Sequence, residues 1–234
     1  MKSIVIASGL DQAAAAGISK KIEDAPDRFF SLIEATRAAS ASDPWLLRRT
    51  DKGKGLPADY EPADLAALEG SGIPVSRPGH RLRKPAVEAL AAMAGAAREE
   101  GVTLIVSSAY RSFEYQKDLF ARNVAEMGEK EAARVSAAPG ASQHQLGTAA
   151  DFGSITDAFA LTEAGRWMAA NAGRFGFSLS YPKGMEAATG YVWESWHYRF
   201  IGKDAVALQD EYFGGVQHYL MQFLDALFRA PPKG

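Results

Sequence analysis

The 234-residue sequence contains no cysteine. This absence excludes disulfide frameworks, thiol nucleophiles and zinc sites built on thiolates. Any metal site must therefore use histidine, aspartate or glutamate side chains. Histidine itself is scarce, because the chain has four residues of this type: His80, His144, His197 and His218.

Strong charge bias and long apolar runs are also missing. The net charge of −2 balances 26 basic against 28 acidic residues, which gives no support for a nucleic-acid or anionic-membrane partner. No segment approaches the roughly 18 apolar residues of a membrane span. The apolar run at residues 4–7 is broken by Ser8 and Gly9 and is shorter than a typical signal-peptide core, so we expect no export signal in the chain as it stands.

What is present is typical of a globular protein, with 47% hydrophobic and 23% charged residues. The length is sufficient for one substantial domain with a buried core. We expect an N-terminal arm with a helix over residues 1–40 and a single domain with C-terminal helices over residues 41–234. A monomer is expected.

Apolar spacing and turn residues predict helices and strands in mixed order. Helices are predicted over residues 27–39, 61–68, 85–101, 112–128, 130–137, 162–171, 205–212 and 216–228. Strands are predicted over residues 102–107, 149–152, 177–181, 191–193 and 196–201. Residues 1–25 are expected to be loosely packed, and residues 40–60 to form a surface loop. Because the order lacks βαβ regularity, it favours the α+β class.

The most informative stretch is Ser142–Asp151, which places His144 and Asp151 seven positions apart across Gly147. Asp151 lies in an apolar predicted strand, and a buried carboxylate needs a partner. A metal ion shared with His144 would supply one. A hydrogen-bonded structural histidine is the alternative interpretation of this stretch alone.

A second polar cluster contains Glu194 and His197. The surrounding aromatic and β-branched residues favour a strand, in which positions three apart face opposite sides. The chain must therefore bend near Ser195 if both side chains are to reach one site, as strands often do beside active sites. A surface glutamate and a sheet histidine are the alternative.

A third element is Arg111, between a predicted strand and the helix that Ser112 is expected to cap. From this place a guanidinium group can direct its planar fork of donors at a carboxylate or a developing oxyanion. An ordinary solvated arginine is the commoner case. Gln116 lies about one helical turn further on and could share the same cleft.

In this order the motifs resemble the VanY-like D-alanyl-D-alanine carboxypeptidases, of the lysostaphin, D-Ala-D-Ala metallopeptidase and hedgehog group. The resemblance covers about residues 45–202 and rests on Tyr110-Arg111-Ser112 with Gln116, on Ser142–Asp151, and on the stretch from Thr189 to Arg199. One position departs from the family pattern, because Ser195 stands where the family usually has proline.

The resemblance implies a fold in which a small antiparallel sheet packs against helices around a zinc cleft. It implies that His144, Asp151 and His197 bind Zn²⁺. It further implies that Glu194 is the catalytic base and that Arg111 contacts the scissile carbonyl or the terminal carboxylate. The substrate contacts that it implies are Tyr110, Gln116, Ser142 and Trp196.

The implied substrate is a peptidoglycan stem peptide, from which the enzyme would remove a terminal D-alanine outside the cytoplasm, in the periplasm or cell envelope. L,D-carboxypeptidase activity on tetrapeptide stems and peptidoglycan endopeptidase activity are alternatives. A non-catalytic peptidoglycan-binding module is a further one, since a fold does not determine function. The retained Glu194 argues against it. His80 and His218 are expected to be structural.

Overall fold

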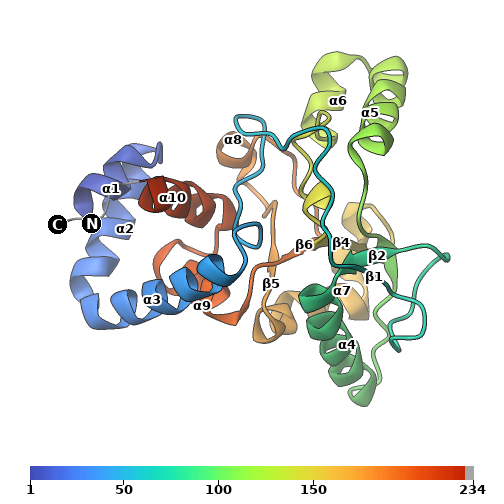
Figure 1. Cartoon of the computed structure of the whole chain (residues 1–234), viewed down its shortest axis with the longest axis horizontal. Helices are drawn as coiled ribbons and strands as arrows, with labels where there is room; N and C mark the ends of the chain where they lie inside the picture. The colour runs from blue at the N-terminus through green and yellow to red at the C-terminus, as the bar shows by residue number, and fades with distance from the viewer. Residues whose placement is uncertain (230–234) are drawn as a thin grey trace. The chain divides into compact units, whose positions relative to one another are not determined.

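The computed structural model describes residues 1–229, so the end of the expected domain, residues 230–234, lies outside the described residues. The chain divides into two compact units (Figure 1): residues 1–49 together with the described chain from Ile201 onward, and Thr50–Phe200. This division differs from the arm and single domain expected from the sequence. Whether the segments on either side of residue 40 fold independently, as the expected boundary implies, stays a prediction.

The first unit is helical. Its helices are α1 (Lys2–Ala7), α2 (Gln12–Asp24), α3 (Pro26–Ser42), α9 (Lys203–Tyr212) and α10 (Gln217–Arg229). The expectation of a loosely packed segment over residues 1–25 was wrong, because the Asp11 carboxylate caps α2 and Ile18 and Ile22 are buried one turn apart. The helix predicted over residues 27–39 is confirmed as α3, and its Phe29 ring packs edge to face with Tyr212 at 5.0 Å.

The second unit combines two small sheets with helices. Its strands are β1 (Leu65–Ala67), β2 (Arg81–Arg83), β3 (Val106–Ser108), β4 (Ala149–Phe152), β5 (Phe177–Leu179) and β6 (His197–Phe200). Its α-helices are α4 (Lys84–Glu99), α5 (Phe113–Met127), α6 (Glu129–Val135), α7 (Glu163–Asn171) and α8 (Glu186–Thr189). Short 3₁₀ helices are η1 (Gln143–Leu146), η2 (Asp157–Leu161) and η3 (Ala172–Phe175).

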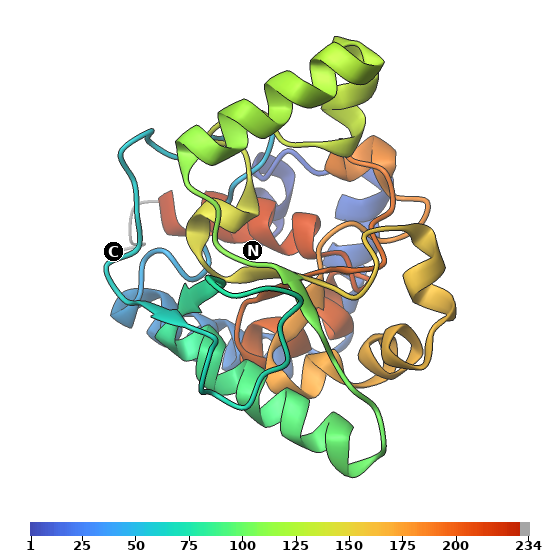
Figure 2. The ribbon, with the colours of Figure 1, turned by 90° about the vertical axis from the view of Figure 1, so that its right-hand side faces the viewer.

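The central sheet has four strands in the order β3-β4-β6-β5, and all neighbouring strands are antiparallel. Helix α4 lies on one side of this sheet and the α5–α6 pair on the other, as both views show (Figures 1 and 2). A hydrophobic core forms where Leu90 and Met93 of α4 meet Phe152 of β4 and Met168 of α7. The α+β class predicted from the sequence is confirmed.

Several predicted elements differ from the observed ones. Residues 65–67 form a strand paired with β2 instead of the predicted helix over residues 61–68, because long-range pairing outweighs weak local helix preference. The strand predicted over residues 102–107 is reduced to β3. Residues 191–193 form no strand. In the described part of the chain, no helix is long and apolar enough to cross a membrane.

Candidate metal centre

Strand pairing brings two predicted metal ligands together. Asp151 of β4 and His197 of β6 occupy directly opposite positions in the sheet, and His197 Nδ1 lies 2.9 Å from Asp151 Oδ1. Both residues are at most 3% exposed. The apolar residues around Asp151 drive its strand into the core, so the carboxylate is carried inside with it.

The 3₁₀ helix η1 positions His144 beside this pair. The Ser142 hydroxyl accepts a hydrogen bond from the His144 backbone amide, and Gly147 ends the helix in the left-handed conformation, with φ of 70°. The carbonyl oxygen of Ala109 lies 2.7 Å from His144 Nδ1. This carbonyl oxygen is the hydrogen-bond partner of Nδ1, and the other ring nitrogen of His144, Nε2, lies 3.3 Å from Asp151 Oδ2.

These three side chains fit a metal ion. One donor atom from each of His144, Asp151 and His197 lies within 4.8 Å of the other two, and all three residues are buried. Two imidazoles and one carboxylate form a donor set of the kind found in catalytic zinc sites, which keep a further position open for water. His80 and His218 are not members of this group.

Glu194 approaches the same centre from a turn. The His197 backbone amide donates to the Glu194 carbonyl oxygen at 3.2 Å, and the Glu194 amide donates to the Tyr181 carbonyl oxygen at 3.1 Å. This turn is the bend expected near Ser195. It places Glu194 Oε2 3.7 Å from His197 Nδ1. Glu194 is thus adjacent to the three donors without belonging to the compact group that they form.

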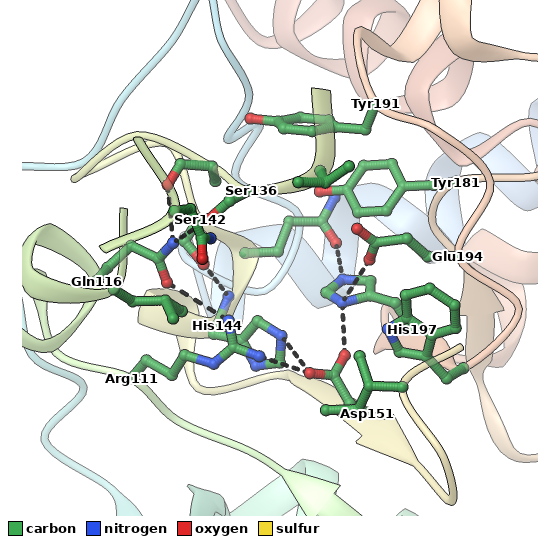
Figure 3. Close-up of a pocket in the computed structure, with 17 residues that line it drawn as sticks. Arg111, Gln116, Ser136, Ser142, His144, Asp151, Tyr181, Tyr191, Glu194 and His197 are labelled. Carbon is green, nitrogen blue, oxygen red and sulfur yellow. Dashed lines mark hydrogen bonds and ion pairs between the residues drawn. The ribbon is translucent and has the colours of Figure 1, made fainter. Parts of the chain in front are cut away.

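Arg111 borders the centre on the opposite side (Figure 3). Its Nη2 donates to Asp151 Oδ2 at 2.5 Å and its Nε to the Ser108 hydroxyl at 2.9 Å. Its Nη1 contacts Gln116 Oε1 at 3.5 Å. The Gln116 amide in turn donates to the Ala137 carbonyl oxygen at 2.7 Å. The side chain is therefore held in one orientation at the edge of the cleft.

Burial and these charges set the protonation of the site. Burial raises the pKa of Asp151, but its interactions with His144 and Arg111 outweigh burial and hold this pKa well below its usual range. Burial and the charge of Arg111 lower the pKa of His144 to about 4, which keeps its imidazole neutral and able to bind a metal. Burial raises the pKa of Glu194 to about 7.

These residues open onto one cleft with a volume of about 240 Å³. Of the predicted substrate contacts, Gln116, Ser142 and Trp196 line the cleft together with the metal-binding group, Glu194 and Arg111. Tyr110 does not line it. Its ring packs instead against the guanidinium group of Arg81, 5.3 Å away.

Tyr181 and Gln143 line the cleft but were not among the predicted site residues, and Ser180 contacts Gln143 from behind it. The Tyr181 ring packs against His197, with centroids 5.0 Å apart. Gln143 Oε1 lies 3.2 Å from His197 Nε2 and accepts a hydrogen bond from the Ser180 hydroxyl. The position of Gln143 next to His144 is a signal in the sequence. Ser180 carries none, because it joins the site only through pairing of β5 with β6.

Comparison with known proteins places these residues in a family. Residues 79–203 match the family model described as VanY, D-alanyl-D-alanine carboxypeptidase. A similar protein is the putative carboxypeptidase YodJ of Bacillus subtilis. It is 38% identical over 186 residues, an alignment that covers 74% of this chain and 68% of the relative.

Two solved structures are similar in both fold and sequence. The LdcB LD-carboxypeptidase aligns with a TM-score of 0.65 and 36% identity over 73% of this chain and 86% of that one. The vancomycin resistance D,D-pentapeptidase VanY, determined in complex with Zn(II), aligns with a TM-score of 0.63 and 32% identity over 77% of this chain and 99% of that one.

Proposed function

The chain belongs to the VanY D-alanyl-D-alanine carboxypeptidase family, and we propose that it is a zinc-dependent carboxypeptidase that removes the terminal D-alanine from peptidoglycan stem peptides. The observation that carries this proposal is the convergence of His144, Asp151 and His197 with Glu194 and Arg111 around one cleft. An ordinary structural histidine pair would need neither a buried carboxylate between the rings nor a second carboxyl group beside them.

The metal ligands in this proposal are His144 through Nε2, Asp151, and His197 through Nδ1. When bound, zinc would supply a Lewis acid that lowers the pKa of water and polarises a carbonyl oxygen. The low pKa values of His144 and Asp151 suit metal binding, because both side chains are then deprotonated at neutral pH.

Glu194 is the proposed general base. Burial raises its pKa to about 7. A carboxyl group with a pKa near neutral pH is partly deprotonated there and also takes up a proton readily, as a general base must. The carboxylate accepts a proton from the attacking water and passes it to the amine that leaves as D-alanine. This amine needs the proton, because an amide anion is a poor leaving group.

Arg111 is proposed to hold the end of the peptide. It is the one cationic side chain among the described residues that line the cleft, and a guanidinium group binds carboxylates with fixed geometry. Contact with the terminal carboxylate would restrict cleavage to the last residue. Gln116, Ser142 and Trp196 are proposed to contact the rest of the substrate from the cleft walls. Tyr110 lies outside the cleft, where its ring packs on Arg81.

The similarity to an L,D-carboxypeptidase favours a second candidate, removal of D-alanine from a tetrapeptide stem. The two candidates share the terminal D-alanine and differ in the configuration of the residue before it. Because peptidoglycan lies outside the cytoplasm, we propose an extracytoplasmic location. A monomer is also proposed, since one chain supplies every site residue.

The test is incubation of zinc-loaded protein with pentapeptide and tetrapeptide stems, followed by mass spectrometry. Loss of one alanine from the pentapeptide alone supports D,D-activity, and loss from the tetrapeptide supports L,D-activity. Cleavage within the stem would indicate an endopeptidase. Zinc binding without hydrolysis of any stem would overturn the proposal in favour of a binding module.

A further inference from the structure

We propose that Gln143 is a positioning residue of the metal centre: its side-chain carbonyl oxygen holds the proton of His197 on Nε2 and thereby leaves Nδ1 free to bind the metal. This inference rests on the metal site of the proposed function. It adds a residue whose side chain is not a ligand and does not act on the peptide.

The contact between Gln143 and His197 is buried. Gln143 Oε1 lies 3.2 Å from His197 Nε2, and Gln143 is 7% exposed. An amide oxygen only accepts hydrogen bonds, so the ring nitrogen that faces it must carry the proton. The neutral imidazole then has its lone pair on Nδ1, the nitrogen that faces Asp151.

Ser180 holds the side-chain oxygen of Gln143 beside His197. The Ser180 hydroxyl donates to the same oxygen at 2.7 Å. The Ser180 backbone amide donates to the His197 carbonyl oxygen at 3.2 Å, so the hydroxyl is anchored to the strand that carries the ligand. In this arrangement Oε1 accepts from the Ser180 hydroxyl and faces His197 Nε2.

This hydrogen bond opposes a competing one. Asp151 Oδ1 lies 2.9 Å from His197 Nδ1, and a carboxylate at this distance favours a proton on that nitrogen. A proton on Nδ1 would block metal binding, because a histidine ligand must offer a lone pair. Gln143 favours the other tautomer from the opposite side of the ring. When the metal displaces the Nδ1 proton, the buried Nε2–H group keeps its acceptor.

His144 shows the same arrangement with a different acceptor. Its Nδ1 is held by the carbonyl oxygen of Ala109 at 2.7 Å, which leaves Nε2 facing Asp151. Each ring thus has an oxygen acceptor behind it, as metal-binding histidines usually do. For His144 the acceptor is backbone and cannot be removed by substitution. For His197 it is the side chain of Gln143, which can be.

Gln145 provides a matched control. It lies on the same 3₁₀ helix and is fully buried, but its amide donates to the carbonyl oxygens of Pro57 and Tyr60, at 2.9 and 3.1 Å. Replacing either glutamine by leucine removes a buried amide from η1. Only replacement of Gln143 removes an acceptor from His197.

The experiment measures zinc affinity by competition with a chromophoric chelator. We expect Gln143→Leu to weaken zinc binding about 10- to 100-fold, the usual cost of losing a partner behind a metal ligand. Gln143→Glu, which keeps an oxygen acceptor, should restore most of the affinity. Gln145→Leu should lower the melting temperature and leave zinc affinity unchanged. In metal-free wild-type protein, ¹⁵N NMR should show the His197 proton on Nε2.

Each outcome separates this inference from the proposed function. Failure of the wild-type protein to bind zinc would refute the metal site itself. Tight zinc binding by the wild type with equal affinity in Gln143→Leu would overturn the role of Gln143 alone. If Gln143→Leu does not fold, Ser180→Ala takes its place, because loss of the Ser180 donor frees the amide to rotate. Unchanged affinity and an unchanged Nε2–H signal in Ser180→Ala would then contradict the inference.

Discussion

Asp151 and His197 face each other across strands β4 and β6, with Asp151 Oδ1 2.9 Å from His197 Nδ1. Because the two residues are paired in register, the backbone hydrogen bonds of the sheet hold these ligands together. Glu194 depends instead on a turn, and its Oε2 lies 3.7 Å from the same nitrogen. The proposed metal ligands therefore sit on regular structure, and the proposed base sits on irregular structure beside it.

Substitutions at Glu194 and His197 should separate catalysis from metal binding. Glu194→Gln removes the proton acceptor but no ligand, so zinc content should persist while kcat falls about 10²- to 10⁴-fold. His197→Ala removes a ligand, so zinc and activity should both be lost. Metal analysis of the purified variants, together with stem-peptide hydrolysis, measures both effects.

A substitution at Gln116, an uncharged residue of the cleft, serves as the control for the Glu194 and His197 variants. Gln116→Ala should alter KM more than zinc content, since Gln116 lines the cleft but is not a member of the metal-binding group. Undiminished hydrolysis by Glu194→Gln would remove Glu194 from its proposed role. Full zinc content in His197→Ala would remove His197 from the ligand set.

Replacement of Gly147 by alanine should damage both stability and metal binding. Its φ of +70° is unfavourable for other residues, and an added Cβ would lie 2.9 Å from Arg83 Cγ and 3.0 Å from Leu65 Cδ2. The left-handed conformation alone costs about 1–2 kcal/mol, and crowding should add about 1–3 kcal/mol. Because Gly147 ends the helix that carries His144, zinc affinity should fall as well.

Gly184→Ala is the matched control, with φ of +79° and no atom within 4 Å of the added Cβ. It should show the conformational cost without crowding and without a change in zinc affinity. Urea unfolding of both variants gives the two free energies of unfolding. Equal destabilisation by the two substitutions would mean that the contacts around Gly147 relax without cost.

Ser195 tests how the turn holds Glu194. Ser195 is buried, with 6% of its surface exposed, and its side-chain oxygen has no hydrogen-bond partner among the described residues. An unpartnered buried hydroxyl destabilises the folded state. Ser195→Ala should therefore raise the free energy of unfolding by about 1 kcal/mol and leave kcat unchanged. A fall in kcat would show that the hydroxyl helps to position the base at this departure from the family proline.

Local chemistry explains which elements could be predicted. The β4 strand was predicted with its observed limits because it leaves the turn at Gly147 and is apolar apart from Asp151. Ser112 was a predicted helix cap, and its side chain accepts a hydrogen bond from the backbone amide of Tyr115, three residues later. These features depend on neighbours in the sequence, and the motifs of the site could be recognised for the same reason.

Long-range contacts explain what could not be predicted. Strand β1 exists through pairing with β2, in which Leu65 lies opposite Arg83. Ser180 enters the metal centre because the end of β5 meets the backbone of His197. Tyr110 belongs to a recognised motif, but its ring packs on Arg81 outside the cleft. No local pattern distinguishes these positions from ordinary loop and strand residues.

The stability of the metal-free protein should depend on pH through Glu194. Burial raises its pKa from 4.5 to about 7, so between these values the folded state binds more protons than the unfolded state. The stabilisation is fully present below about pH 4.5 and is lost as pH rises through 7, by at most about 3 kcal/mol. Glu194→Gln stays neutral, so the free energy of unfolding of this variant minus that of wild type should grow over this range. Urea unfolding of both proteins at several pH values measures this difference. The contributions of groups that both proteins share, such as Asp151, cancel in it. A difference that does not change with pH would contradict the raised pKa of Glu194.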